Sequence, residues 1–179
     1  MFSLFSFDKV KKFLFAGFIL LAIAAIMSGC STDPDDDTNV PGALPAALIG
    51  KWVPTNVGGD YYEITNAGGA QTLKYEDGGY GFGYQGSIEF VSNFDSKTGV
   101  IIIKYNDNTN KNKPNPFHAL YYLKLTDTGS VELNNTSDLA NNYADADTTT
   151  LNEAINKFTR GNMSNYIDLA WSATYTKQP

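Results

Sequence analysis

Residues 80–94 read YGFGYQGSIEFVSNF, and this stretch decides the fold. Large apolar side chains alternate in it with small or polar ones, at a period of two residues. Successive side chains of a β-strand point to opposite faces, so this period is typical of a strand with one buried face. The side chains predicted to share the buried face are Tyr80, Phe82, Tyr84, Ile88, Phe90 and Phe94.

Runs of similar character recur along the chain after about Leu48. With a first strand near Trp52, the predicted number of strands is about eight. This pattern favours a mainly β fold, a single antiparallel up-and-down β-barrel, with a β-sandwich as the alternative. The other predicted strands are 61–64, 71–75, 100–105, 119–125, 131–133 and 169–175.

Two predicted hairpins specify their own register, because opposed residues of an antiparallel pair lie on the same face. The first places Phe90 opposite Ile103, and the second places Lys124 opposite Glu132 on the wet face. Opposite charges across two strands favour such a register by a few tenths of a kcal/mol. The remaining predicted pairs are Ile88–Tyr105, Glu89–Lys104, Leu123–Leu133 and Leu125–Val131.

One helix is predicted before the last strand. Thr150 followed by Glu153 is typical of a capping box, and Gly161 after Arg160 is a C-terminal stop. The helix carries one apolar stripe, which something must cover. We therefore expect it to pack on the outside of the sheet or to plug one end. The stripe consists of Leu151, Ala154, Ile155 and Phe158.

Residues 1–29 have the three zones of a secretory signal peptide: a basic region at 9–12, an apolar run at 13–27 and small residues before Cys30. As a helix, the apolar run would span about 22 Å, short of a hydrocarbon core of about 30 Å. Residues 27–30, Met-Ser-Gly-Cys, resemble the bacterial lipobox, whose cysteine is lipidated and becomes the mature N-terminus. An uncleaved anchor is the alternative.

Lipidation of Cys30 implies a membrane partner, because two or more acyl chains such as palmitate hold a protein stably at a bilayer. We expect the chain in the bacterial cell envelope, facing the periplasm or the cell surface. The acidic and Pro-rich residues 30–47 are predicted to form a flexible tether, with an acidic metal-binding tail as the alternative. Residues 48–179 are predicted to form the barrel domain.

The charge balance excludes one class of partner. Residues 30–179 hold 10 Lys and Arg against 18 Asp and Glu, a net charge of −8, which repels nucleic acid.

One Cys excludes an internal disulfide framework, and one His disfavours His-rich metal sites and His-based catalytic triads. Glu63, Glu89 and Glu132 have the parity of the wet face. We therefore expect no enzyme activity and no bound metal or cofactor. We also expect the chain to be monomeric.

Alternate connections of an up-and-down barrel fall at the same end, and here one end collects the longer loops. Long loops are often functional, and small molecules bind at barrel mouths. This end is therefore the predicted mouth. Its connections are 54–59, 76–79, 106–118 and 134–149. Its candidate contact residues are Asp77, Asp107, Phe117, His118 and Tyr143.

Tyrosine can line a cavity, since its ring is apolar and its hydroxyl needs a partner, or it can fill a core. Tyr121 has the predicted inward parity and Tyr122 the outward one. Asp145 and Asp147 are consistent with a cation site or with acids placed before the helix N-terminus. The candidate ligand-lining residues are Trp52, Tyr62, Tyr84, Tyr105 and Tyr121.

Gly50-Lys51-Trp52 resembles the Gly-x-Trp signature of lipocalins and related calycin barrels. Residues 94–105 and 154–162 are similar to small lipoproteins of spirochaetes such as treponemes. These resemblances imply a surface or periplasmic lipoprotein with a lipocalin-like barrel. Our leading hypothesis for the function is a lipid-anchored barrel that binds a small apolar ligand, or a host or envelope protein, through its long-loop end. The alternative is a structural or antigenic surface lipoprotein with a filled barrel and no ligand.

Overall fold

The computed structural model describes residue 39 and residues 41–56, 59–79, 83–106 and 115–179. The predicted signal peptide at 1–29, Cys30 and the mouth candidate Asp107 lie outside these residues. No helix formed by the described residues is both long and apolar enough to cross a bilayer.

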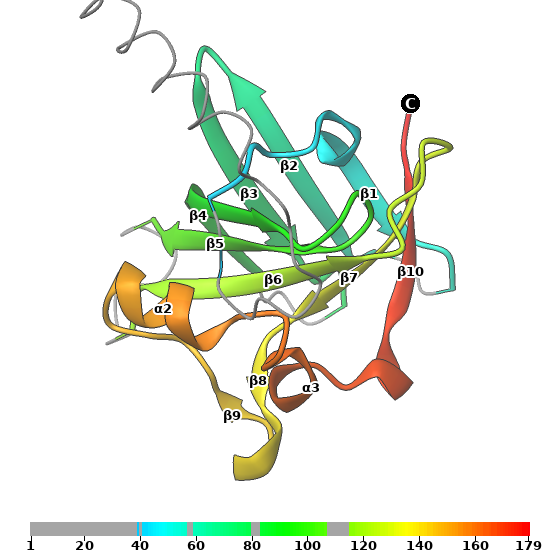
Figure 1. The fold of residues 1–179 in the computed structure, drawn as a ribbon. Coiled ribbons are helices and arrows are strands. Elements are labelled where there is room, and N and C mark those ends of the chain that lie inside the picture. Colours follow the sequence, from blue (N-terminus) through cyan, green and yellow to red (C-terminus); the bar gives the residue numbers. More distant parts are fainter. Residues whose placement is uncertain (1–38, 40, 57–58, 80–82, 107–114) are drawn as a thin grey trace, which may run out of the picture. The chain divides into compact units, whose positions relative to one another are not determined.

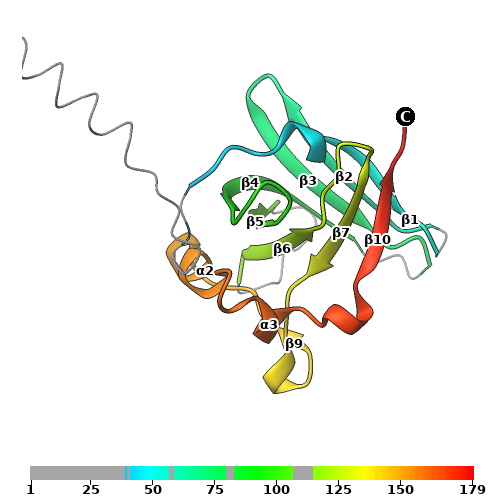
Figure 2. The ribbon, with the colours of Figure 1, turned by 45° about the vertical axis from the view of Figure 1, so that its right-hand side comes forward.

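Eight antiparallel strands close into a barrel, which confirms the predicted fold and excludes the sandwich (Figure 1, Figure 2). Each strand pairs with its sequence neighbour up to β7, and β10 closes the barrel between β7 and β1. The barrel strands are β1 (Gly50–Pro54), β2 (Tyr61–Ala67), β3 (Ala70–Glu76), β4 (Gly83–Asn93), β5 (Gly99–Tyr105), β6 (Phe117–Leu123), β7 (Ser130–Asn135) and β10 (Ala173–Lys177).

The chain between β7 and β10 adds a small sheet and short helices outside the barrel. Figure 1 shows these elements together, away from the β2–β3 turn. They are β8 (Ser137–Asp138), the 3-10 turn η2 (Leu139–Asn141), β9 (Ala144–Asp145), α2 (Leu151–Lys157), α3 (Met163–Tyr166) and the 3-10 turn η3 (Leu169–Trp171).

The end of the barrel with short connections is closed. Gly68 and Gly69 turn β2 into β3 with φ of 62° and 87°, as a two-residue type I′ turn requires. The chain before β1, including the 3-10 turn η1 (Ala46–Leu48), crosses this end. There the Gly42 N–H donates to the Val91 carbonyl at 2.7 Å, and Leu44 is buried in the core.

Residues 41–47 were predicted as part of the flexible tether, but they pack on the barrel. Burial of Leu44 and of the following Leu48 holds them there, because apolar side chains gain about 25 cal/mol per Å² on leaving water. The barrel domain therefore begins before residue 48. Asn39, further back, donates to the Phe158 carbonyl at 3.0 Å.

Buried side chains from all eight strands form one core in the barrel interior. Its largest members, such as Trp52 and Leu73, are completely buried. The Trp52 indole N–H donates to the Leu48 carbonyl at 2.7 Å, which satisfies its one polar group.

A second core lies outside the barrel, where α2 covers β5 and β6. Thr150 and Glu153 form the predicted capping box, and Phe158 on the predicted stripe is fully buried. The prediction that the helix packs on the outside of the sheet is confirmed. Because of this cover, β5 buries both faces, with Ile101 inside the barrel and Ile102 beneath the helix region.

The predicted register of the β4–β5 hairpin is wrong throughout, and neither Phe90–Ile103 nor Ile88–Tyr105 pairs. Ile88 lies opposite Ile103, and a bulge at Glu89 then brings Phe90 opposite Ile102. An extra residue in one strand reverses the face of all that follow. Phe90, predicted inside, therefore packs in the outer core. The predicted partner of Glu89, Lys104, lies opposite Ser87 instead.

A similar shift occurs at the end of β6. Lys124 has a left-handed backbone, with φ of 54°, and Leu123 lies opposite Glu132. The Lys124 ammonium still reaches the Glu132 carboxylate, at 2.7 Å, so the predicted ion pair forms without the predicted pairing. The turn separates the face of Leu125, inside the barrel, from that of Leu123, outside it.

Of the predicted strand 169–175, only the part from residue 173 onward is extended. Strand β10 begins at Ala173, and the preceding residues form the 3-10 turn η3. The Asp168 carboxylate accepts the Ala170 N–H at 3.0 Å, which caps that turn and competes with an extended backbone. Trp171, predicted to face the core, is 84% exposed.

Candidate functional site

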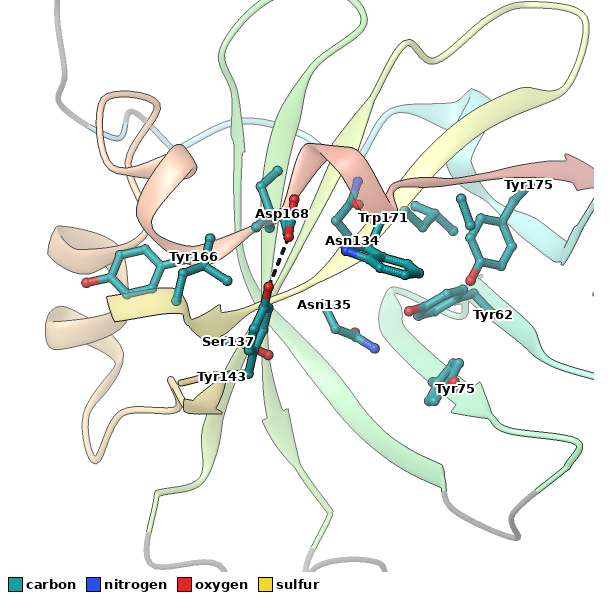
Figure 3. Close-up of a pocket in the computed structure, with 14 residues that line it drawn as sticks. Tyr62, Tyr75, Asn134, Asn135, Ser137, Tyr143, Tyr166, Asp168, Trp171 and Tyr175 are labelled. Carbon is teal, nitrogen blue, oxygen red and sulfur yellow. Dashed lines mark hydrogen bonds between the residues drawn. The ribbon is translucent and has the colours of Figure 1, made fainter. Parts of the chain in front are cut away.

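The long-loop end of the barrel holds two adjoining pockets, here called the mouth pockets. The Trp171 pocket has a volume of about 260 Å³ and lies among Tyr62, Tyr75, Tyr175 and Trp171 (Figure 3). The His118 pocket has a volume of about 300 Å³ and lies among Tyr84, Tyr105, His118 and Asp145. Both are lined by Asn135, Ser137 and Tyr143, so they share a wall.

Five tyrosines of the barrel strands form the floor of the mouth pockets, and we call them the tyrosine collar. Cross-strand pairing places Tyr62 opposite Tyr75, and Tyr75 opposite Tyr84, so each ring meets the next. Such aromatic contacts stabilise a sheet beyond simple burial. The centroid distances are 5.2 Å for Tyr175–Tyr62, 4.7 Å for Tyr62–Tyr75, 5.4 Å for Tyr75–Tyr84 and 5.7 Å for Tyr84–Tyr105.

His118 continues the collar and anchors a buried polar network. One ring nitrogen, Nδ1, lies 2.7 Å from an Asp147 carboxylate oxygen, and the other, Nε2, lies 3.2 Å from the Asn135 side-chain oxygen. The Tyr105 hydroxyl donates to Asp147 at 2.9 Å, and the Tyr84 hydroxyl donates to Asn135 at 2.6 Å. Buried polar groups need such partners, and here Asn135 at the end of β7 and Asp147 before α2 supply them.

Burial raises the pKa of the collar hydroxyls, because the charged tyrosinate loses water. Burial is the largest cause for Tyr62, Tyr84 and Tyr105, and the Asp147 carboxylate adds to the pKa of the last two. The pKa of Tyr175 rises to about 12, again by burial first and then by the Asp60 carboxylate. The collar therefore stays neutral at physiological pH and offers hydroxyl groups.

The outer rim of the Trp171 pocket consists of exposed aromatic side chains. Tyr143 is 59% exposed, and its hydroxyl donates to the Asp168 carboxylate at 3.0 Å, the contact drawn in Figure 3. Behind Trp171, the Asn134 side chain is 91% buried, and its oxygen accepts from the Ser172 hydroxyl at 2.8 Å. The nitrogen of the same side chain has no hydrogen-bond partner among the described residues.

The candidate lining residues divide into three groups. Tyr62, Tyr84 and Tyr105 line the mouth pockets. Trp52 lies in the filled interior and lines neither pocket. Tyr121, predicted to face inward, lies in the outer core, while Tyr122 faces the interior. The left-handed turn at Lys124 explains this error, since it breaks the alternation that linked Tyr121 to Leu125.

The candidate mouth contacts also divide. His118 and Tyr143 line the mouth pockets. Asp77 does not line them, but its carboxylate lies near enough to raise the pKa of Tyr75, behind burial and Asp60 as larger causes. Phe117 packs on the outer core, because its parity in β6 is opposite to that of His118.

Sequence reasoning missed several mouth residues. Tyr75 and Tyr175 lie on the inward faces of their predicted strands, and that parity could have placed them in the collar. Asn135 and Ser137 lie within the predicted mouth connection 134–149, but no pattern in the sequence singled them out. Trp171 was assigned to a strand that the Asp168 cap prevents.

The three glutamates with wet-face parity lie away from the mouth. Glu63, Glu89 and Glu132 line neither mouth pocket. No group of three or more His, Cys, Asp and Glu side chains placed to hold a metal occurs in the described part of the chain. Comparison of the chain with protein-family models, curated proteins and solved structures gives no match.

Proposed function

We propose that this chain is a lipid-anchored binding module of the bacterial cell envelope, which holds a small molecule in the mouth of its barrel. The mouth pockets carry this proposal. Together they form a concave site at the long-loop end, lined by strands that are fixed by the barrel. Ligand sites favour the mouths of β-barrels, and sites of about 300 Å³ and above take small molecules.

The lining bears on the kind of ligand. The sequence predicts an apolar molecule, but the mouth offers tyrosine hydroxyls together with Asn135 and Ser137. The Tyr84 hydroxyl donates to Asn135, but its oxygen can also accept a hydrogen bond, which a purely apolar ligand could not donate. The lining therefore favours a molecule that combines apolar surface with polar groups.

A structural or antigenic surface protein without a ligand is the second candidate. The packed core favours it, since Trp52, Ile64 and Leu73 are completely buried in the barrel interior. In that case the exposed Trp171 and Tyr143 would serve contacts with a host or envelope protein.

Anchoring is the part of the proposal that rests on Cys30 and on the resemblance to spirochaete lipoproteins. Expression in a bacterium fed labelled palmitate tests it. We expect label on the wild-type chain and its recovery in the membrane fraction. Cys30→Ala should lose the label, and unchanged labelling of this variant would contradict lipidation at Cys30.

Native mass spectrometry of the full chain in mild detergent tests the ligand. We expect a copurified small molecule on the wild-type chain and its loss in Ser137→Phe, which fills the wall between the mouth pockets. Ser96→Phe is the matched control, because Ser96 is exposed in the loop after β4, at the opposite end. The absence of any bound molecule, or equal binding by both variants, would favour the second candidate.

A further inference from the structure

The large apolar side chains that are exposed in the described part of the chain gather at the Trp171 pocket. They are Tyr143, which is 59% exposed, Leu169, which is 55% exposed, and Trp171, which is 84% exposed. Tyr143 and Trp171 line the pocket, and Leu169 lies in the same 3-10 turn as Trp171. Tryptophan is usually highly buried, and apolar side chains that are exposed together often mark a binding site. The pocket therefore presents the open face of an aromatic ring.

The Asn134 side chain lies next to Trp171, as Figure 3 shows, and only one of its two polar atoms has a partner. Its oxygen accepts from the Ser172 hydroxyl at 2.8 Å, whereas its nitrogen has no hydrogen-bond partner among the described residues. A buried donor without a partner costs free energy, so such a group calls for an explanation. Asn134 lines the Trp171 pocket, and a ligand in the pocket can supply the partner.

The position of Asn134 in the sheet would suit an apolar side chain. Asn134 lies opposite Tyr121 in the β6–β7 pairing, and opposed residues share a face, so both lie on the outer face of the barrel. Tyr121 and Ile167 belong to the apolar outer core, and Ile167 also lines the Trp171 pocket. A polar amide in such surroundings is a local conflict, which is typical of functional positions rather than stabilising ones.

Two strands part at Asn134. The pairing of β7 with β10 runs from Ser130–Thr176 to Leu133–Ala173, and the chain before Ala173 forms η3 instead of continuing the strand. The Asn134 nitrogen is closed to solvent. All three residues of η3 are exposed, so the turn can move outward at little cost in buried area. An outward shift of η3 would open the amide to the pocket.

The Asn134 amide needs a group that can both donate and accept. In the orientation found here the unpartnered atom is the nitrogen. With the amide turned by 180° it would be the oxygen, because the Ser172 hydroxyl can bond to either atom. A hydroxyl serves both orientations, whereas a carbonyl oxygen or an ammonium group serves only one. The negative face of the Trp171 ring, in turn, favours the polarised C–H groups on the face of a sugar ring.

We propose that the Trp171 pocket binds a neutral sugar ring, a pyranose whose C–H face stacks on Trp171 while one of its hydroxyls bonds to the Asn134 amide. This inference rests on the proposed function and adds the chemical class of the ligand. It requires no free charge at the mouth, because the ligand is neutral. An apolar molecule of the same shape would cover the ring but leave the Asn134 nitrogen without a partner.

The two tryptophans allow a direct measurement, because acrylamide quenches the fluorescence of the exposed Trp171 but not that of the completely buried Trp52. The probes are the methyl β-glycosides of glucose, galactose and N-acetylglucosamine. Tetrahydropyran, the same ring without hydroxyls, is their matched control. With the full chain in mild detergent, at least one glycoside should protect Trp171 from quenching. It should bind about tenfold or more tightly than tetrahydropyran, because only the glycoside offers a partner to Asn134.

Asn134→Leu distinguishes a binding role from a structural one. It removes the unpartnered nitrogen at similar side-chain size, and the Ser172 hydroxyl keeps a second acceptor in Glu132, at 3.2 Å. In isothermal titration this variant should lose the preference for the glycoside. Its midpoint of thermal unfolding should equal that of the wild type or rise, because a buried donor without a partner is gone. Asn66→Leu, at an exposed position in β2 near the closed end, is the matched control and should keep the preference.

Trp171→Ala is the second test, and it decides alone if Asn134→Leu does not fold. The Trp171 side chain is too exposed for its loss to unfold the barrel. The variant should weaken glycoside binding in isothermal titration by about tenfold or more, because the stacking face is lost. Glycoside binding that survives in Trp171→Ala would place the sugar elsewhere and overturn the inference.

Three other outcomes also overturn it. Unchanged glycoside binding in Asn134→Leu together with a lower midpoint of unfolding would make Asn134 a structural residue, with a buried water as its partner. Equal binding of the glycosides and tetrahydropyran would reject the sugar while leaving a small-molecule site. If no glycoside protects Trp171, the sugar is rejected, and the search for a copurified molecule by mass spectrometry decides separately whether the mouth binds anything.

Discussion

Toward its short-loop end the barrel core consists of aliphatic side chains around Trp52 and Tyr122 and is covered by residues 41–48, whereas at its long-loop end tyrosines, amides and acids surround open pockets. The same strands supply both ends. Ile64 and Leu73 lie opposite each other near the closed end, and Tyr62 and Tyr75 lie opposite each other near the mouth. Two residues along each strand thus change a dry core into a polar floor.

This difference suits the closed end to stabilising the fold and the open end to binding. Aliphatic side chains at the closed end need no partners, so they pack densely and stabilise the fold. The tyrosine hydroxyls at the open end need acceptors, and Asn135 supplies one from the end of β7 while Asp147 supplies another from the loop before α2. Function is commonly placed on such loops because the scaffold below them holds them in position.

The two tryptophans of the chain give the strongest test of this separation. Trp52→Ala at the closed core should lower the free energy of unfolding by about 3–5 kcal/mol, because it removes a fully buried ring and leaves a cavity. Trp171→Ala at the open rim should change it by less than about 0.5 kcal/mol. Denaturant unfolding of both variants measures this, and similar losses would contradict a division between the two ends.

Alkaline pH should weaken the open end through its tyrosines. Their pKa values are raised in the folded chain, so it keeps protons that the unfolded chain loses above about pH 10. The free energy of unfolding is therefore undiminished below pH 10 and falls as the pH rises above it. Tyrosinate absorbance and circular dichroism, followed together, should show most ionisation coinciding with unfolding.

Tyr175 should ionise before Tyr105, because the pKa of Tyr175 rises only to about 12, while burial and the Asp147 carboxylate raise that of Tyr105 further. Tyr175→Phe should remove an early step of the absorbance titration and leave the later steps in place. An unchanged titration would mean that Tyr175 is as inaccessible as the rest of the collar.

Substitutions at Lys124 test whether its left-handed backbone is what places Leu123 outside the barrel and Leu125 inside it. Its left-handed backbone is unfavourable for an L-residue and worst for a β-branched one, so Lys124→Val should cost about 1–2 kcal/mol. Lys124→Gly relieves the backbone but loses the exposed ion pair to Glu132, so it should stay within about 0.5 kcal/mol of wild type. Equal stability of the two variants would remove the backbone explanation.

The barrel could be predicted because period-two patterns and short turns survive in the local sequence. The faces could not be predicted throughout, because one bulged residue at Glu89 and one left-handed residue at Lys124 each reverse the parity of their neighbours. Of the mouth, the sequence indicates the end and the tyrosines Tyr62, Tyr84 and Tyr105. The contributions of Asn135 and Trp171 depend on long-range packing that no local pattern encodes.

Helix α2 packs in the outer core and begins near the open end. Removing its N-cap therefore tests whether the mouth can unfold locally while the closed end stays folded. Thr150→Ala removes the side chain that accepts the Glu153 N–H at 3.2 Å and should cost about 1 kcal/mol. Asp147 lies three residues before this cap and hydrogen-bonds both His118 and Tyr105, so fraying of α2 should reach the His118 pocket.

Hydrogen exchange measures this effect. In Thr150→Ala, exchange should become faster at residues 147–158 and stay unchanged at the amides of β2 and β3 near Ile64 and Leu73. The control Thr128→Ala, in the exposed loop before β7, should change exchange in neither region. Uniform acceleration in Thr150→Ala would show that the two ends unfold as one unit.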